Sequence, residues 1–302
     1  VTPGTPVSPT VPDNQTVVVE PAITIKKKIV KLVYAKQAIR VHKNATFKKG
    51  EGTFYQKKPR IYAPVFKVTG VAYSKNGLLR YKVKGGYITA NPDFVAPVYY
   101  SGKQRKVTVI SPKGIYLHKG PGFKQSDRKK ATFLKQGTTV KNIVRVVRHG
   151  QFATRFYLAN GSYITGNKLF VSTKAPYTPY KVYNIKAINR YKTVNLNGKL
   201  GHYANKPRTQ RAVFKVNKWD YSRGDVRTMH GVKRYKVKGG YITANPKYVR
   251  SLYYLTKPKT VKVINNKGIY YHVNKQFANR QKTMYVKKGT QIKIKAIKQY
   301  GK

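Results

Sequence analysis

The feature that most constrains the fold is a long internal repeat. Residues 80–92 and residues 234–246 share the sequence RYKVKGGYITANP, at a separation of 154 residues. Identity of this length does not arise by chance, so both stretches are expected to fold alike. A looser copy, FYLANGSYITGNK at 156–168, lies midway and keeps six positions: Tyr157, Gly161, Tyr163, Ile164, Thr165 and Asn167. The period is therefore about half of 154, and the chain is built from related units.

The rest of each period repeats as well. KVTVISPKGIYLH (106–118) matches KVINNKGIYYH (262–272), and ATFLKQGTTV (131–140) matches TMYVKKGTQI (283–292). We therefore predict four units, named units one to four below, over residues 23–104, 105–175, 176–256 and 257–302. Unit four is incomplete because no copy of the Tyr-Ile-Thr element follows Gly301. In unit three, about six residues are inserted before the motif, in a segment that contains Trp219 to His230.

The chain opens on a stretch of different composition. Residues 1–22 begin VTPGTPVSPTVPDNQT, rich in Pro, Thr and Val without a period, which predicts an extended linker. A linker implies a further upstream part, either a cargo protein or a surface-layer domain. No stretch approaches the roughly 20 apolar residues of a membrane helix, which argues against membrane insertion. There are 0 cysteines, so disulfides and thiolate metal sites are excluded.

Alternation dominates the local pattern. In VKVIN, IKIKAI and RYKVK, apolar and basic residues take turns, which is the period of a half-buried β-strand. Turns rich in glycine separate these segments, and no sustained helical stripe occurs. The prediction is an all-β chain of tandem small antiparallel units, either SH3-like barrels or sandwiches.

Charge sets the expected partner. The sequence has 64 Lys and Arg against 7 Asp and Glu, a formal charge of +57. Such a chain repels itself unless anions screen it, so a polyanionic partner is expected. Its 40% hydrophobic content, with 26 Tyr and 11 Phe, nevertheless favours a folded protein over a disordered one.

Three motifs together resemble a known family. They are a G-I-Y-x-H strand, a later KKGT turn and a closing Y-x-x-x-G-x-Y-I-x-x-N element. They are similar to the surface-layer protein (SLAP) cell-wall-anchoring repeats of lactobacilli, although Thr89 and Thr243 stand where that family usually has another residue. The resemblance implies non-covalent binding of teichoic or lipoteichoic acid and an extracellular place in the cell wall or surface layer.

The RYKVK strand supplies the candidate binding residues. Alternate residues of a strand point to opposite faces, so cations line one face if Tyr81 and Val83 pack inward. These cations are Arg80, Lys82 and Lys84 in unit one and Arg234, Lys236 and Lys238 in unit three. Their spacing of about 6–7 Å is comparable with that of phosphates along a polyol-phosphate chain. The plainer alternative is a solvated strand face, whose charges could be replaced at little cost in stability.

The tyrosines of the motif have two interpretations. Tyr87, Tyr163 and Tyr241 could stack on sugar substituents, but a tyrosine beside a glycine at a strand start more often packs in a core. The paired glycines at 85–86 and 239–240 are interpreted as a turn. Asn91, Asn167 and Asn245 are expected to close the following turn through side-chain to backbone hydrogen bonds.

Unit two is expected to differ from its neighbours. In the ungapped alignment, Phe156 and Leu158 replace Arg80 and Lys82, so this row loses its charge. Units one and three are therefore predicted to bind the polymer.

Neither metal nor cofactor chemistry is indicated. His118 and His272 occupy equivalent repeat positions, which predicts packed residues rather than ligands. Asp220, Asp225 and His230 match no metal-ligand spacing. The few acids are scattered, so no carboxylate pair or catalytic triad is indicated and the chain is not expected to be an enzyme.

Two other functions remain open. Basic strands with aromatic residues also suit single-stranded nucleic acid, although no RNP, KH, zinc or helix-turn-helix motif occurs. A self-assembling surface coat is the other, against which the charge argues.

Overall fold

The computed structural model describes residues 31–124, 128–174, 177–222, 231–278 and 282–300. Within these residues the chain forms strands and short 3-10 turns but no α-helix, so the predicted all-β class is confirmed. None of them forms a helix that is long and apolar enough to span a bilayer. The predicted linker at 1–22 lies outside the described residues.

The same succession of eight strands occurs in units one, two and three. Unit one contains β1 (Lys31–Ala35), β2 (Ile39–Val41), β3 (Thr53–Tyr55), β4 (Val65–Val68), β5 (Gly70–Tyr73), β6 (Leu79–Val83), β7 (Gly86–Thr89) and β8 (Val95–Pro97). Unit two contains β9 (Val107–Val109), β10 (Ile115–His118), β11 (Arg128–Leu134), β12 (Thr139–Val140), β13 (Ile143–His149), β14 (Ala153–Leu158), β15 (Tyr163–Thr165) and β16 (Val171–Ser172). Unit three contains β17 (Lys181–Asn184), β18 (Ile188–Tyr191), β19 (Lys199–Tyr203), β20 (Val213–Lys215), β21 (Lys218–Tyr221), β22 (Lys233–Val237), β23 (Gly240–Thr243) and β24 (Val249–Ser251). Short 3-10 turns at Arg60–Tyr62 and Arg208–Gln210 precede β4 and β20.

Each complete unit is a sandwich of a small and a large antiparallel sheet. In unit two the small sheet has the order β12-β9-β16 and the large sheet β11-β10-β15-β14-β13. Unit three repeats both as β20-β17-β24 and β19-β18-β23-β22-β21. In unit one the large sheet is two pieces, β2-β3 and β5-β6-β7, joined by a bridge between His42 and Tyr87. No sheet closes on itself among the described strands, so of the two predicted architectures the sandwich is the one formed.

Hydrophobic side chains fill the space between the sheets. The isoleucine of the Tyr-Ile-Thr element is completely buried in all three units, as Ile88, Ile164 and Ile242. Around Ile164 lie Val107 and Val109 from the small sheet, together with Phe156 from the large one. The alternation in the sequence therefore separates an inner face of the large sheet, turned to the core, from an outer face, turned away from it.

Glycines shape the hairpin that presents the motif. Gly85 has φ +85°, a conformation that favours glycine, and a Cβ on Gly86 would lie 2.0 Å from the carbonyl oxygen of His42. The predicted turn is confirmed. The predicted asparagine turns are confirmed too, because each Asn Oδ1 accepts a backbone N–H two residues on: from Asp93 to Asn91 at 2.9 Å, from Leu169 to Asn167 at 2.8 Å and from Lys247 to Asn245 at 2.9 Å.

The insertion in unit three lies later than the sequence indicates. Lys218 pairs with Lys236 as Gly70 pairs with Lys82, so β21 is the counterpart of β5. Trp219 is therefore a buried strand residue and not part of an insertion. The extra residues therefore lie between Tyr221, where β21 ends, and Lys233, where β22 begins.

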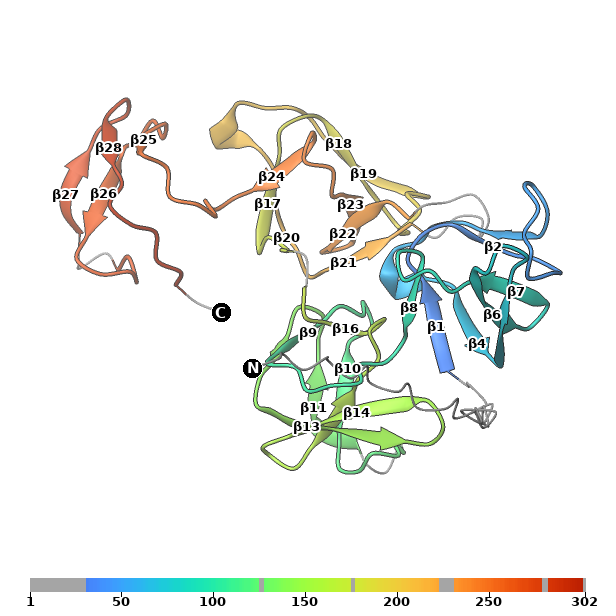
Figure 1. Cartoon of the computed structure of the whole chain (residues 1–302). Helices are drawn as coiled ribbons and strands as arrows, with labels where there is room; N and C mark the ends of the chain where they lie inside the picture. The colour runs from blue at the N-terminus through green and yellow to red at the C-terminus, as the bar shows by residue number, and fades with distance from the viewer. Residues whose placement is uncertain (1–30, 125–127, 175–176, 223–230, 279–281, 301–302) are drawn as a thin grey trace, which may run out of the picture.

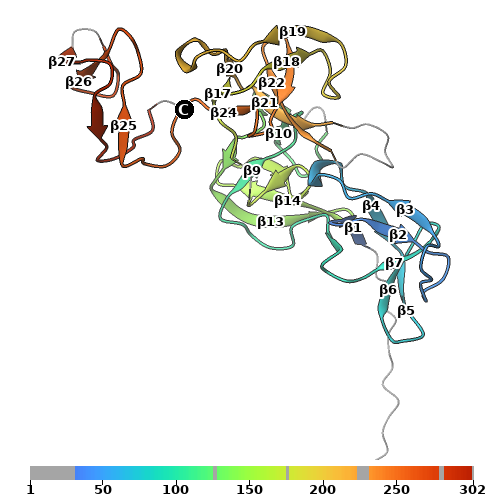
Figure 2. The ribbon, with the colours of Figure 1, turned by 90° about the horizontal axis from the view of Figure 1, so that it is seen from above.

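Units one, two and three pack directly against one another. Tyr34, Ala63, Val98 and Leu169 form a hydrophobic cluster shared by units one and two. The core of unit three also receives Ile110 from unit two, and Ile61 of unit one packs against it. Both views show these three units side by side (Figures 1 and 2).

Unit four is a half-sandwich. It contains β25 (Thr260–Lys262), β26 (Ile269–His272), β27 (Lys282–Val286) and β28 (Gln291–Lys293), paired as β25-β28 and β26-β27. Its counterparts of β5 to β8 are missing from the described residues. Ile269 is consequently 39% exposed, whereas Ile115 at the equivalent place in unit two is 8% exposed. Figures 1 and 2 both show this unit, in red, apart from the other three.

Candidate functional site

The predicted binding residues of unit one lie on the outer face of its large sheet. Val83 belongs to the core and Tyr81 packs against it, so Arg80 and Lys82 point the other way. Lys82 pairs with Tyr87 across the hairpin, which brings this tyrosine to the outer face as well. Of the two interpretations of Tyr87, core packing is therefore wrong, because the inward position belongs to Ile88.

Arg80 is held by the protein itself. Its guanidinium carbon lies 4.0 Å from the centroid of Phe47, and its Nε donates a hydrogen bond of 3.2 Å to the carbonyl of Ala45. Phe47 in turn stacks on His42 at a centroid distance of 3.9 Å. Desolvation lowers the pKa of Arg80, although an arginine stays charged in proteins. Arg80 is thus part of a stack of three side chains, whereas Lys82 and Lys84 are exposed.

Unit three has the same strand geometry with different neighbours. Arg234 is half-buried, desolvation lowers its pKa, and its Nε has no hydrogen-bond partner among the described residues. Lys236 lies over the ring of Tyr241, with its Nζ 4.4 Å from the centroid. Lys238 is exposed in the hairpin turn. In units one and three, the cations best placed to meet a ligand are therefore the lysines rather than the arginines.

The prediction that unit two lost its cation is wrong. Arg155 pairs with Thr165 as Arg80 pairs with Thr89, so Arg155 and not Phe156 is the counterpart of Arg80. The hairpin of unit two has one additional residue, which displaces an ungapped alignment by one position. Phe156 is 0% exposed in the core.

Arg155 repeats the stack seen at Arg80. Its guanidinium carbon lies 3.8 Å from the centroid of Phe123, and its Nε donates to the carbonyl of Pro121 at 3.0 Å. His118 stacks on Phe123 at 3.9 Å, so this histidine is a packed residue, as predicted. In unit four, His272 and Phe277 form the equivalent pair at 4.8 Å. Aligning R-F-Y-L at 155–158 with R-Y-K-V at 80–83 would have identified Arg155 as the counterpart of Arg80.

The outer face of unit two carries tyrosine where units one and three carry lysine. Tyr157 takes the place of Lys82 and Lys236, and its ring lies 5.0 Å from that of Tyr163 across the hairpin. Arg145 on β13 places its guanidinium carbon 4.6 Å from the centroid of Tyr157. Sequence reasoning missed the outer position of Tyr157 because the alignment was displaced, and it missed Arg145 because this residue lies outside the aligned motif.

Acidic partners for these cations are scarce. Between the described residues one salt bridge forms, from Lys48 Nζ to Glu51 Oε1 at 3.9 Å, with both side chains largely exposed. Asp220 is 3% exposed and accepts hydrogen bonds from the hydroxyl of Tyr62 and the backbone N–H of Tyr221. The positive charge of the described residues is thus left for solvent ions or for a ligand to neutralise.

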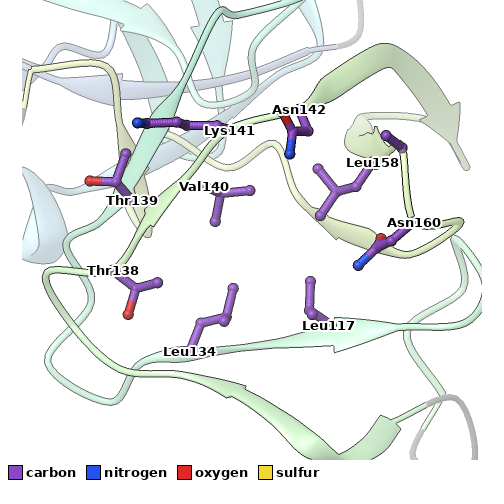
Figure 3. Close-up of a pocket in the computed structure, with 10 residues that line it drawn as sticks. Leu117, Leu134, Thr138, Thr139, Val140, Lys141, Asn142, Leu158 and Asn160 are labelled. Carbon is purple, nitrogen blue, oxygen red and sulfur yellow. The ribbon is translucent and has the colours of Figure 1, made fainter.

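One cavity opens between the sheets of unit two. It has a volume of about 490 Å³, and leucine and valine side chains line it together with polar ones (Figure 3). Its lining consists of Leu117, Leu134, Thr138, Thr139, Val140, Lys141, Asn142, Leu158, Ala159 and Asn160. Lys141 is the one charged residue among them, so this lining offers neither a carboxylate nor an imidazole for acid-base chemistry.

Metal ligands do not gather in the part of the chain that the structure describes, where no group of three His, Cys, Asp or Glu occurs. Asp220 lies on β21, while Asp225 and His230 fall outside the described residues.

Comparison with known proteins gives one match. A family model described as a domain of unknown function, DUF5776, matches residues 25–95 and 99–171. These two stretches coincide with most of units one and two, so the chain is similar to that family in two successive copies. No curated protein matches the chain, and no solved structure matches it. The resemblance to SLAP repeats accordingly stays a prediction.

Proposed function

We propose that this protein is a non-catalytic module that binds an anionic cell-wall polymer, a teichoic or lipoteichoic acid, and so attaches a surface-layer or other secreted protein to the cell. One observation carries the proposal: 64 Lys and Arg stand against 7 acids, and a single salt bridge forms between described residues. A folded chain with so much unpaired positive charge is suited to a ligand that carries negative charge at regular intervals. The proposal places the protein outside the cell, within the wall or surface layer.

The outer faces support this proposal. They combine lysines with half-buried tyrosines: exposed Lys82 pairs with Tyr87, and half-buried Lys236 pairs with Tyr241. Lysines on the outer face of a sheet can follow a flexible polyphosphate without requiring a deep pocket. Because units one and three are linked covalently, binding by one raises the effective concentration of polymer at the other.

Single-stranded nucleic acid is the second candidate, favoured by the cation–aromatic contact between Arg145 and Tyr157. Basic grooves with aromatic rings bind such strands through phosphates and base stacking.

The test is retention of the full chain on bacterial walls. We expect retention on intact walls, its loss on walls stripped of teichoic acid, and a decrease by orders of magnitude between about 50 and 200 mM salt. Retention that changes neither on stripped walls nor with added salt would overturn the proposal. Tighter binding to single-stranded oligonucleotides than to walls would favour the second candidate, and self-association without either ligand would favour a surface coat.

A further inference from the structure

The outer faces of the units are not equivalent. Unit one pairs a cation with an aromatic ring at two places, Arg40 with Phe54 and Lys82 with Tyr87. At the same two places, unit two pairs one aromatic residue with another: Tyr116 with Phe133, and Tyr157 with Tyr163. Their ring centroids lie 5.2 and 5.0 Å apart. Cations in one unit are thus replaced by rings in the next.

These rings lie on one side of one sheet. Ile115 belongs to the core of unit two and Leu117 packs against it, so Tyr116 and His118 lie on the opposite face of β10. His118 pairs directly with Tyr163. Tyr163 pairs in turn with Tyr157, which places both aromatic pairs on the outer face of unit two. We call Tyr116, Phe133, Tyr157 and Tyr163 the aromatic face.

The rings are accessible and already positioned. Tyr116 is 36% exposed and Phe133 is 48% exposed, while the other two are half-buried. Phe133 lies against Gly114, where an added Cβ would come within 2.5 Å of its ring. Glycine is therefore needed beneath this ring. Binding a ligand here costs little side-chain entropy, because packing already restricts the rings.

Unit four repeats the first of these pairs. Tyr270 and Tyr285 lie 5.3 Å apart, are 44% and 50% exposed, and occupy the places of Tyr116 and Phe133. Gly268 lies beneath Tyr285, as Gly114 lies beneath Phe133. Unit three has Asn189 and His202 instead.

We propose that the aromatic face binds sugar rings carried by the same anionic polymer whose phosphates meet the lysines of units one and three. The inference rests on the proposed function and specifies it, because it requires a polymer that contains sugar. The carbon-bound hydrogens on one face of a sugar ring pack on an aromatic ring, and its hydroxyls can reach the tyrosine hydroxyls at the edge. Arg145, exposed beside Tyr157, is placed for a neighbouring phosphate.

Ring geometry favours sugars over nucleobases. The planes of Tyr116 and Phe133 meet at 58°, and those of Tyr157 and Tyr163 at 50°. Rings tilted in this way present separate facets of single-ring size instead of one flat platform. A base gains its stacking energy from flat overlap, whereas a puckered sugar fits one facet and the angle beside it.

The repeat itself supplies the variant for the test. Tyr116→Arg with Tyr157→Lys gives unit two the residues that unit one has at these places, so the sheet is expected to accept them. Tyr116→Phe with Tyr157→Phe keeps both rings and is the matched control. Binding of the full chain is titrated against a poly(glycerol phosphate) that bears hexose substituents, against the same polymer without sugar, and against a single-stranded oligonucleotide.

We expect the native chain to bind the glycosylated polymer roughly three- to ten-fold more tightly than the bare one, as expected for one or two aromatic contacts. The Arg/Lys variant should lose this preference although it carries two more positive charges, and the Phe control should keep it. Equal binding of both polymers by the native chain, a preference that survives in the Arg/Lys variant, or tighter binding of the oligonucleotide would each overturn the inference. If neither polymer binds, the proposed function fails along with it.

Discussion

The hydroxyl of Tyr62 in unit one donates a hydrogen bond of 2.6 Å to the carboxylate of Asp220 in unit three. Asp220 is 3% exposed and also accepts the backbone N–H of Tyr221 at 2.7 Å. Burial raises the pKa of Tyr221, and the charge of Asp220 raises it further. One of the few acids of the chain is therefore used to join two units that are separated in sequence by a whole unit.

Removing the Tyr62 hydroxyl should destabilise this contact. We expect Tyr62→Phe to lower the free energy of unfolding by about 1–3 kcal/mol, because a buried carboxylate loses one of its donors. Urea denaturation of the native chain and the variant measures this difference. Tyr73→Phe is the control, since Tyr73 is 68% exposed and should change stability little. Equal effects of the two variants would show that the contact does not stabilise the protein.

Much of the fold could be predicted from the sequence because the repeat and the strand alternation are local signals. Alternation places Val83 inside and Lys82 outside, and the structure agrees. The contact between Tyr62 and Asp220 could not be predicted in this way. It depends on how unit three packs on unit one, and no repeated residue marks that contact.

Two of the errors, those on Arg155 and Trp219, have a common physical origin in hairpin length. One additional residue between Tyr157 and Tyr163 displaced the alignment of unit two and concealed Arg155. In unit three, Trp219 stands where unit one has Val71, so residue similarity did not reveal that both belong to the same strand. A turn can absorb residues without changing the sheet, and an alignment without gaps cannot detect this.

Replacing Arg155 should lower the stability of the protein more than replacing an ordinary exposed arginine. Replacing it with Gln removes the contact with Phe123 and the hydrogen bond to Pro121, so we expect a loss of about 1–2 kcal/mol. Arg148→Gln removes the same charge from an exposed position on β13 and serves as the control. Thermal denaturation of both variants compares them. If Arg148→Gln were as destabilising as Arg155→Gln, loss of charge rather than loss of packing would be the cause.

His42 should make unit one sensitive to acid. Burial lowers its pKa, the nearby Arg40 and Arg80 lower it further, and Glu51 opposes them. The folded state therefore resists protonation at a pH where the unfolded chain, with a pKa near about 6.5, accepts a proton. The stability due to neutral His42 is fully present above that value and is lost as pH falls through it towards the lower folded pKa.

Two measurements check this expectation. The imidazole of His42, followed by NMR, should titrate with a midpoint below about 6.5. His42→Phe keeps a ring that can stack on Phe47 but removes the titration, so its unfolding free energy should fall less steeply than that of the native chain between about pH 7 and 5. A His42 titration midpoint of about 6.5, together with the same pH dependence of unfolding free energy in the native chain and the variant, would exclude this contribution of His42.

The last prediction separates binding from stability on the outer faces. Sequence reasoning treats Arg80, Lys82 and Lys84 as one exposed row whose replacement costs little stability, but Arg80 is packed on Phe47. A variant that includes the arginines would therefore confuse loss of binding with loss of folding. The informative variant replaces only the lysines of the two rows by Gln, at Lys82, Lys84, Lys236 and Lys238. Its matched control replaces four exposed lysines away from the outer-face strands, at Lys103, Lys135, Lys141 and Lys206.

Both four-fold variants carry the same net charge, so long-range attraction to a polyanion is equal in the two. We expect both to unfold within about 3 °C of the native chain, because exposed charges contribute little to folding. The contact of half-buried Lys236 with the ring of Tyr241 is worth only roughly 0.5–1 kcal/mol. Wall binding should fall by at least about ten-fold in the outer-face variant only, and its dependence on salt should become shallower, since fewer counterions are released when fewer phosphates are contacted. Retention assays on intact walls at several salt concentrations measure both quantities. If the control lost as much binding as the outer-face variant, the positive charge would act as a diffuse field and the lysine rows would have no special role.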